Sequence, residues 1–254
     1  MFELLKARKR HGTQYVKNIT GSILHERFRG LPLLDSNVQT EDMPELSRIC
    51  PLSAIGKDET VIDIGRCNFC GSCSERYPDK IIFTNFHKTG TDKRSKLIIG
   101  KGQSIDDFFC DSIIVRKEIK KMFGRSLKLR SVSAGGCNAC ELELNACGNV
   151  NFDMGRYGIE VAASPRHSDG LVITGPVTRN MAFALEETFE SIPEPRIIIA
   201  MGACAISGGV FSDSKEIDRG FFDKYIPDLY IPGCPPHPLT FINAVIRFLG
   251  VKYE

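Results

Sequence analysis

The sequence lacks an apolar run of about 20 residues, the length a helix needs to cross a bilayer. The first residues, MFELLKARKRHG, have neither the apolar stretch nor the small-residue cleavage site of a secretory signal. We find no internal repeat, no low-complexity tract, no G-x-G-x-x-G motif and no phosphate-loop lysine motif. With 42% hydrophobic residues among 254, the chain can form a core. We therefore expect a folded, cytoplasmic protein.

A strong net charge is also absent, since the formal charge is only +2. Residues 1–130 carry 24 Lys and Arg against 16 Asp and Glu, whereas residues 131–254 carry 9 against 15. This asymmetry indicates two modules. The basic residues are not interleaved with aromatics and form no nucleic-acid motif, so a solvated or protein-docking surface is favoured over a nucleic-acid site.

Composition divides the chain into four stretches. Residues 1–39 form a basic N-terminal arm, and residues 40–88 a loop-rich domain too small to rely on its own core, which a metal cluster would stabilise. Polar residues 89–103 are predicted to be a linker, and residues 104–254 the second domain. A helix is expected to begin at Ser104 and to continue to Gly124.

The second domain alternates short β-branched runs with helical segments. The runs are LKLRSVS, IEVAAS, DGLVITG, RIIIAMG and LYIPG. Because most of them do not alternate between apolar and polar residues, they are typical of buried parallel strands joined by crossover helices. The sequence therefore predicts an α/β sheet domain.

Ten cysteines in a reducing compartment are better metal ligands than disulfide partners, particularly in C-x2-C pairs. Cys67, Cys70 and Cys73, in GRCNFCGSCSERYPD, keep the C-x2-C-x2-C spacing of a bacterial ferredoxin. Tyr77 stands where that pattern has its fourth cysteine, directly before Pro78. One ligand of the expected cluster must come from elsewhere.

In two-cluster ferredoxins the fourth cysteine of each run ligates the other cluster, so the missing ligand should be an earlier cysteine followed by proline. Cys50, before Pro51, meets this requirement. Counting back from Cys50 gives the three companion positions, which hold Thr40, Met43 and Leu46. One cluster has thus lost all four ligands, and Cys50, Cys67, Cys70 and Cys73 are predicted to bind a single [4Fe-4S] cluster. Zinc is the alternative, although zinc sites usually use separated C-x2-C pairs.

A second set of cysteines follows the predicted strands. Its members are Cys137, Cys140, Cys204 and Cys234. Sites in open α/β sheets gather outside the carboxyl ends of the strands, so these thiols can meet at one edge. Flanking glycines permit tight turns there. This constellation also fits a [4Fe-4S] cluster.

Several other residues have two interpretations. Cys110 and Cys147 are most simply core thiols. His167 and His237 lie near the cluster loops, but structural histidines are more common than ligands. Glu141 is either a proton-relay carboxylate at a partner interface or a solvated charge at a helix start.

The stretch from Val115 to Leu249, with GGCNACELE, SPRHSDGLVITGPVT, MGACAISGG and YIPGCPPHP, resembles the small subunit of energy-converting nickel-iron hydrogenases of the formate hydrogenlyase type. That family is related to the 20 kDa subunit of complex I. The resemblance implies that Cys137, Cys140, Cys204 and Cys234 hold the cluster proximal to a catalytic large subunit. The complex I subunit has two adjacent cysteines at the first position, so the spacing of Cys137 and Cys140 favours the hydrogenase branch.

The N-terminal part, from RFRGLPLLD to KIIFTNF, resembles the two-cluster ferredoxin subunit of the same complexes, the 23 kDa subunit in complex I, without the ligands of one cluster. The two subunits look fused. The expected fold is an α/β flavodoxin-like parallel sheet domain preceded by a small α+β ferredoxin-like domain. Its expected cofactors are two [4Fe-4S] clusters.

The resemblance implies an electron-transfer subunit, without a complete active site, of an oxidoreductase complex of anaerobic metabolism. Its expected partners are a nickel-iron hydrogenase-like large subunit, other complex I-like subunits and a redox protein, which would hold it at the inner face of the membrane. Nucleic acid is not expected. The alternatives are a module of a nickel-free quinone or sulfur reductase and a zinc-stabilised interaction protein.

Overall fold

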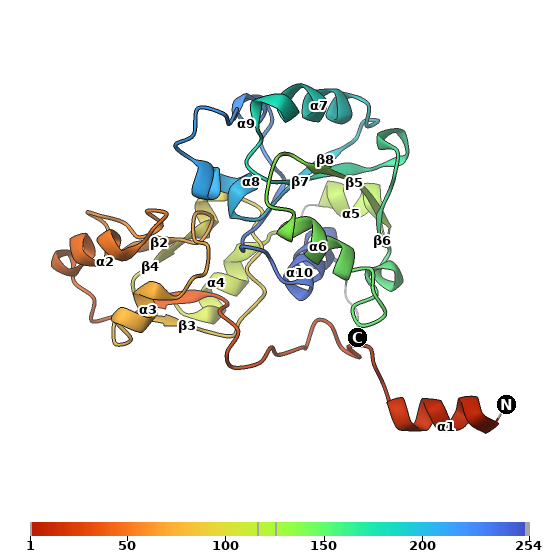
Figure 1. The fold of residues 1–254 in the computed structure, drawn as a ribbon, viewed down its shortest axis with the longest axis horizontal. Coiled ribbons are helices and arrows are strands. Elements are labelled where there is room, and N and C mark those ends of the chain that lie inside the picture. The colour runs from red at the N-terminus through yellow and green to blue at the C-terminus, as the bar shows by residue number, and fades with distance from the viewer. Residues whose placement is uncertain (1, 116, 125, 252–254) are drawn as a thin grey trace.

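A five-stranded parallel sheet forms the centre of the C-terminal half in the computed structural model, which describes residues 2–115, 117–124 and 126–251 (Figure 1). Its strands are β5 (Leu127–Ser133), β6 (Ile159–Val161), β7 (Gly170–Thr174), β8 (Ile197–Met201) and β9 (Leu229–Ile231). Their order across the sheet, β6-β5-β7-β8-β9, is that of flavodoxin-like folds. Every residue of β7, β8 and β9 is buried, which confirms the prediction of buried parallel strands for these three, whereas β5 and the edge strand β6 also contain exposed residues.

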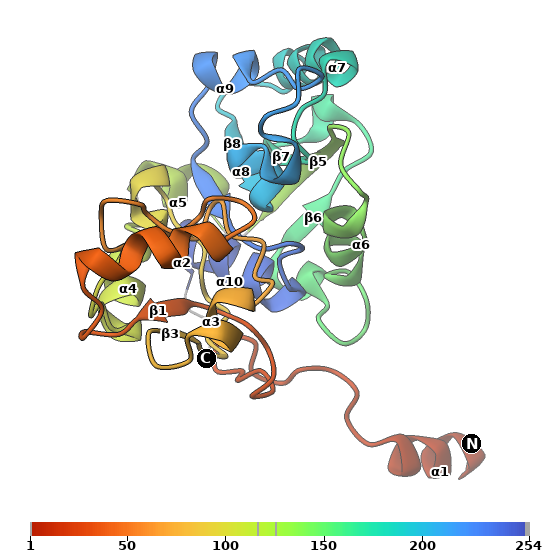
Figure 2. The same ribbon diagram turned by 60° about the vertical axis from the view of Figure 1, so that its left-hand side comes forward.

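Helices cover both faces of this sheet (Figures 1 and 2). One face packs against α5 (Lys117–Phe123), α6 (Ala139–Ala146) and α10 (Pro238–Leu249), and the other against α7 (Arg179–Glu190) and α9 (Gly220–Lys224). Short turns complete this half: α8 (Ala203–Ser207), η3 (Met154–Tyr157), η4 (Pro165–His167) and η5 (Gly209–Phe211). In β7, Val172 faces the first layer while Leu171 and Ile173 face the second, as the two-residue period of a strand requires.

The N-terminal half contains two small antiparallel sheets. In one, β1 (Pro32–Leu34) pairs with β3 (Ile81–Phe83), and in the other β2 (Val61–Asp63) pairs with β4 (Ile98–Gly100). Its helices are α1 (Phe2–His11), η1 (Thr40–Asp42), α2 (Met43–Ile49), α3 (Ser72–Arg76), η2 (Arg94–Leu97) and α4 (Ile105–Ser112). These small sheets give only weak support for the expected ferredoxin-like domain. Helix α1 projects away from the rest of the molecule (Figures 1 and 2). No helix in the described ranges is long and apolar enough to cross a membrane.

Three of the four positions that lack cluster ligands take part in the core of this half, whereas Thr40 is exposed. Met43 and Leu46 are 0% and 1% exposed. Tyr77 packs against the same core, and its hydroxyl donates a hydrogen bond to Glu45. Apolar side chains at these positions stabilise a half whose small size limits its core.

The two halves share a packed boundary. The N-terminal core includes Ala200, Ala205 and Tyr230 of the sheet domain. Thr91 exchanges two backbone hydrogen bonds with Tyr230, of 2.8 and 2.9 Å, and so extends the sheet beyond β9. The stretch 89–103 also contains η2 and β4. The domain boundaries stay a prediction, but this stretch is well structured.

The helix expected from Ser104 to Gly124 is two helices. Ser104 caps α4 as predicted, since its hydroxyl accepts a hydrogen bond of 3.1 Å from the Asp107 amide. The single-helix prediction was wrong because the β-branched run that begins at Ile113 favours extended backbone. The amide of Ile114 donates instead to Asp92 at 3.0 Å.

Two candidate cysteine sites and the cavity between them

The four N-terminal cysteines predicted to act together lie side by side. Cys50 directly follows α2, Cys67 and Cys70 are in the loop that leads into α3, and Cys73 is in the first turn of α3. One cavity is lined by Cys50, Cys67, Cys70 and Cys73. The thiols of Cys50, Cys70 and Cys73 also raise the pKa of Cys67, so all four are within electrostatic range. The structure therefore places Cys50 beside the 67–73 loop.

Backbone amides point at two of these sulfurs. Ala54 donates to Sγ of Cys50 and Phe69 donates to Sγ of Cys67, both at 3.2 Å. Phe69 and Gly71 have φ angles of 56° and 86°, which turn the loop around the thiols. Hydrogen bonds to thiolate sulfur are among the features that set the potential of an iron-sulfur cluster.

Burial makes this site unfavourable for free thiolates. It raises the pKa of Cys67 to about 12 and that of Cys73 to about 11, and the neighbouring thiols add to both shifts. Thiolates gathered in such a place need a bound cation for stability. The donor set thus fits a metal group that carries positive iron.

The second set lies at the carboxyl edge of the parallel sheet. Cys137 and Cys140 follow β5, Cys204 is in α8 after β8, and Cys234 follows β9. Burial is the main cause that raises the pKa of Cys140 to about 12, and the charges of Glu141 and of the other three thiols add to the shift. Cys137 and Cys234 likewise raise the pKa of Cys204. The structure brings together the four residues that the sequence predicted.

Two glycines make room for these sulfurs. A β-carbon on Gly202 would lie 2.6 Å from Sγ of Cys140, and one on Gly209 would lie 2.6 Å from Sγ of Cys204. Gly202 also has a φ of 92°. The backbone after β8 can approach the thiols this closely because the residue has no side chain.

Glu141 is anchored inside the second site. Its Oε1 accepts a hydrogen bond of 2.7 Å from the hydroxyl of Thr174, at the end of β7. Its charge contributes to the raised pKa of Cys140. Glu141 therefore lies at a helix start, as one interpretation held, but it is half-buried and hydrogen-bonded rather than solvated, and a role in proton transfer stays a prediction.

Arg219 is a site residue that the sequence analysis missed. Its guanidinium donates to the carbonyls of Cys204, Ala205 and Ile206, at 2.8 to 3.3 Å, and also to that of Pro176. Burial lowers its pKa to about 10. The positive group holds the turn that carries Cys204. Nothing in the local sequence, DRGFFDK, marks this arginine as different from a surface one.

The remaining candidates lie outside the two sets. Cys147 is buried as predicted, but Cys110 is exposed, so its interpretation as a core thiol was wrong. His167 is exposed in η4. His237 caps α10, since its Nδ1 accepts a hydrogen bond of 3.1 Å from the Leu239 amide, and burial lowers its pKa.

Across the described ranges, no three His, Cys, Asp or Glu side chains converge closely enough to hold a single metal ion. This observation concerns a single metal ion, which all its ligands must approach at one point. In a [4Fe-4S] cluster the four cysteines bind different irons, so their sulfurs need not meet at one point.

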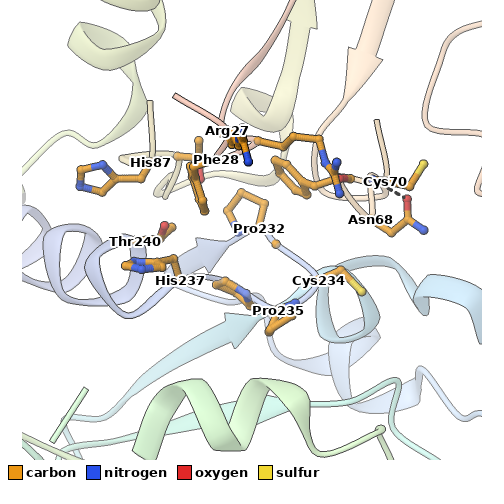
Figure 3. A pocket seen from close by; sticks show the side chains of 16 residues that line it. Arg27, Phe28, Asn68, Cys70, His87, Pro232, Cys234, Pro235, His237 and Thr240 are labelled. Atoms are coloured by element: carbon orange, nitrogen blue, oxygen red, sulfur yellow. Dashed lines mark hydrogen bonds between the residues drawn. The ribbon is translucent and has the colours of Figure 1, made fainter. Parts of the chain in front are cut away.

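A cavity of about 340 Å³ lies between the two cysteine sets (Figure 3). Cys70 of the first set and Cys234 of the second both line it. Arg27, Arg29 and His237 contribute further lining groups. The halves of the chain thus enclose a polar space where their cysteine loops approach each other.

Comparison with known proteins places the chain in a family. The family model described as NADH ubiquinone oxidoreductase, 20 Kd subunit, matches residues 137–248, a range that contains the whole second cysteine set. A probable membrane-bound hydrogenase subunit of Pyrococcus furiosus is 38% identical over 133 residues, which cover 52% of this chain and 79% of that protein. The chain belongs to this family of oxidoreductase subunits.

Other matches cover similar shares of the chain. Formate hydrogenlyase subunit 7 of Escherichia coli is 42% identical over 138 residues, which make up 54% of this chain and 54% of that protein. The chain therefore spans about half the length of this relative. A chain in the structure of a membrane-bound sulfane sulfur reductase, an archaeal respiratory complex, matches with 29% identity, a TM-score of 0.45 and coverage of 52% of this chain and 73% of that one.

Proposed function

We propose that this chain is the electron-transfer subunit of a complex I-like nickel-iron hydrogenase of the formate hydrogenlyase type. It would relay electrons through two [4Fe-4S] clusters to or from a catalytic large subunit. The observation that carries the proposal is the convergence of eight cysteines into two separate sets of four thiols. Membership of an oxidoreductase-subunit family and the hydrogenase names of two relatives support it.

Cys50, Cys67, Cys70 and Cys73 would hold the N-terminal cluster, and Cys137, Cys140, Cys204 and Cys234 the proximal one. When bound, each cluster supplies one-electron exchange at thiolate-held iron. The chain's own residues would orient the thiols. The amides of Ala54 and Phe69 stabilise negative charge on the sulfurs of the first site. Arg219 fixes the turn that presents Cys204.

The N-terminal half would be a ferredoxin-like unit reduced to one cluster and fused to the small-subunit domain. Its buried Met43 and Leu46 support this, since they replace ligands with core side chains. The shared boundary at Thr91 and Tyr230 would keep both cysteine sets in one rigid body.

Partner subunits would supply the catalytic centre and the redox donor or acceptor. The Pyrococcus relative is described as a probable membrane-bound hydrogenase subunit, which supports a peripheral position at the inner face of the membrane through such partners. A nickel-free quinone or sulfur reductase remains the alternative within the same fold. The sequence of the partner large subunit separates the two, because nickel-iron catalysis needs two C-x2-C pairs, one near each end.

The direct test is elemental analysis of the anaerobically purified chain. The proposal predicts about eight irons and as much acid-labile sulfide per chain, from two four-iron centres. Zinc without sulfide would instead identify a zinc-stabilised interaction protein and would end the electron-transfer proposal.

A further inference from the structure

The cavity between the two cysteine sets has the chemistry of an anion site. The residues that line it in the described part of the chain include Arg27 and Arg29 but no Asp or Glu. Apart from the thiolates of Cys70 and Cys234 when clusters are bound, the charged groups of its walls are therefore positive. A low-dielectric cleft with charge of one sign concentrates ions of the opposite sign.

Two threonine hydroxyls line the cavity. Thr89 and Thr240 both line it and are each 3% exposed. Within the described ranges, neither hydroxyl forms a hydrogen bond with another group of the chain. Neither hydroxyl is among the described buried side-chain atoms that lack a partner, so both face the space of the cavity, where a ligand oxygen can accept a hydrogen bond from them.

A histidine adds a third donor. The Nδ1 atom of His237 accepts a hydrogen bond from the Leu239 amide, so in the neutral ring the proton is on Nε2. His237 lines the cavity close to Thr240 in Figure 3. The ring is held by edge-on contacts with Phe28 and Phe152, with centroids 5.6 Å apart in both pairs.

We propose that this cavity binds a small free oxyanion, a phosphate-like or carboxylate-bearing molecule, between the two cysteine sites. The hydroxyls of Thr89 and Thr240 and the Nε2 of His237 would donate to its oxygens, and Arg27 would balance its charge. The volume of about 340 Å³ is within the range of small-ligand pockets and exceeds a single phosphate, so an organic anion also fits.

The position of the site gives it a consequence that rests on the proposed function. A negative charge beside Cys70 and Cys234 would disfavour added electrons on clusters held by either residue. Bound anion would therefore lower both reduction potentials. Binding itself does not depend on iron.

The test is calorimetric titration of the full chain with inorganic phosphate at constant ionic strength. We expect saturable binding of one phosphate per chain. Thr240→Val removes a hydroxyl at nearly constant volume and should weaken binding about tenfold. Thr240→Ser keeps a hydroxyl and should therefore retain phosphate binding. Arg27→Gln, on an exposed side chain that leaves the fold intact, should weaken it, whereas the matched charge removal Arg10→Gln in α1 should not.

Three results would overturn the proposal. The first is the absence of saturable phosphate binding. The second is equal phosphate affinity in the native chain and in Thr240→Val. The third is equal weakening of binding by Arg27→Gln and Arg10→Gln, which would indicate an adventitious ion only. A chain that binds phosphate but contains no iron or sulfide would contradict the proposed function and leave this site standing. A chain with eight irons that does not bind phosphate would contradict this anion site and leave the proposed function standing.

Discussion

Gly202 lies directly against Cys140, so that a β-carbon at Gly202 would stand 2.6 Å from its Sγ. Gly202 follows β8, and Cys140 is in α6, which follows β5. Their contact therefore joins two segments that come from different strands at the carboxyl edge of the sheet. The geometry of the second cysteine set depends on this approach.

Gly202→Ala should therefore displace Cys140 and disrupt the second site. The added methyl group meets sulfur, and a φ of 92° is strained for alanine. We expect iron to fall from about eight to about four per chain, as measured by chemical analysis. Gly124→Ala is the control, because Gly124 also has a positive φ, of 51°, but nothing lies within 4 Å of its added β-carbon. Unchanged iron in Gly202→Ala would contradict the assignment of Cys140.

Arg219→Met should destabilise the fold around Cys204. It leaves the carbonyls of Cys204, Ala205 and Ile206 without their charged donor, and such a loss costs about 3 kcal/mol of the free energy of unfolding. Chemical denaturation measures the change. Arg179→Met, at an exposed position of α7, should change the free energy by less than about 0.5 kcal/mol. Equal stability of the two variants would show that Arg219 does not organise this turn.

His87 should make the stability of the protein depend on pH. It is 3% exposed, and burial lowers its pKa from 6.5 to about 4, with further lowering by Lys88 and His237. Below pH 6.5 the unfolded chain binds a proton that the folded chain does not, so stability is present above pH 6.5 and falls as the pH drops towards 4. Between pH 7 and 5.5 the loss from this group is about 1 kcal/mol.

Denaturation of His87→Gln at both pH values measures this contribution. The variant should lose less stability than the native chain on acidification, while His167→Gln, at an exposed position, should behave like the native chain. If His87→Gln keeps the full pH dependence, other groups carry it.

The grouping of the cysteines into two sets could be predicted from the sequence, whereas their role as cluster ligands stays a prediction. The spacing of Cys67, Cys70 and Cys73 indicates a cluster loop, and the rule that fourth cysteines cross over leads from there to Cys50. The β-branched runs before Cys204 and Cys234 placed them at the ends of strands, and the sheet order then brings them together.

Other features have no local signal. The bonds of Arg219 to three successive carbonyls depend on where α8 and α9 meet, which spacing along the chain does not reveal. The pairing of Thr91 with Tyr230 joins residues 139 positions apart. The break after α4 was missed because apolar residues recur at helical spacing through the β-branched run that begins at Ile113. In the structure, the preference of this run for extended backbone outweighs the helical pattern.

The central claim is that Cys50 completes the N-terminal site across a repeat that has lost its other ligands. The most direct test is low-temperature EPR spectroscopy, with iron analysis, of the anaerobically purified Cys50→Ser chain, with Cys110→Ser at an exposed thiol as the control. We predict that Cys50→Ser alters or removes only one of two four-iron signals, while Cys110→Ser retains both and about eight irons. Two signals unchanged in Cys50→Ser would contradict the account.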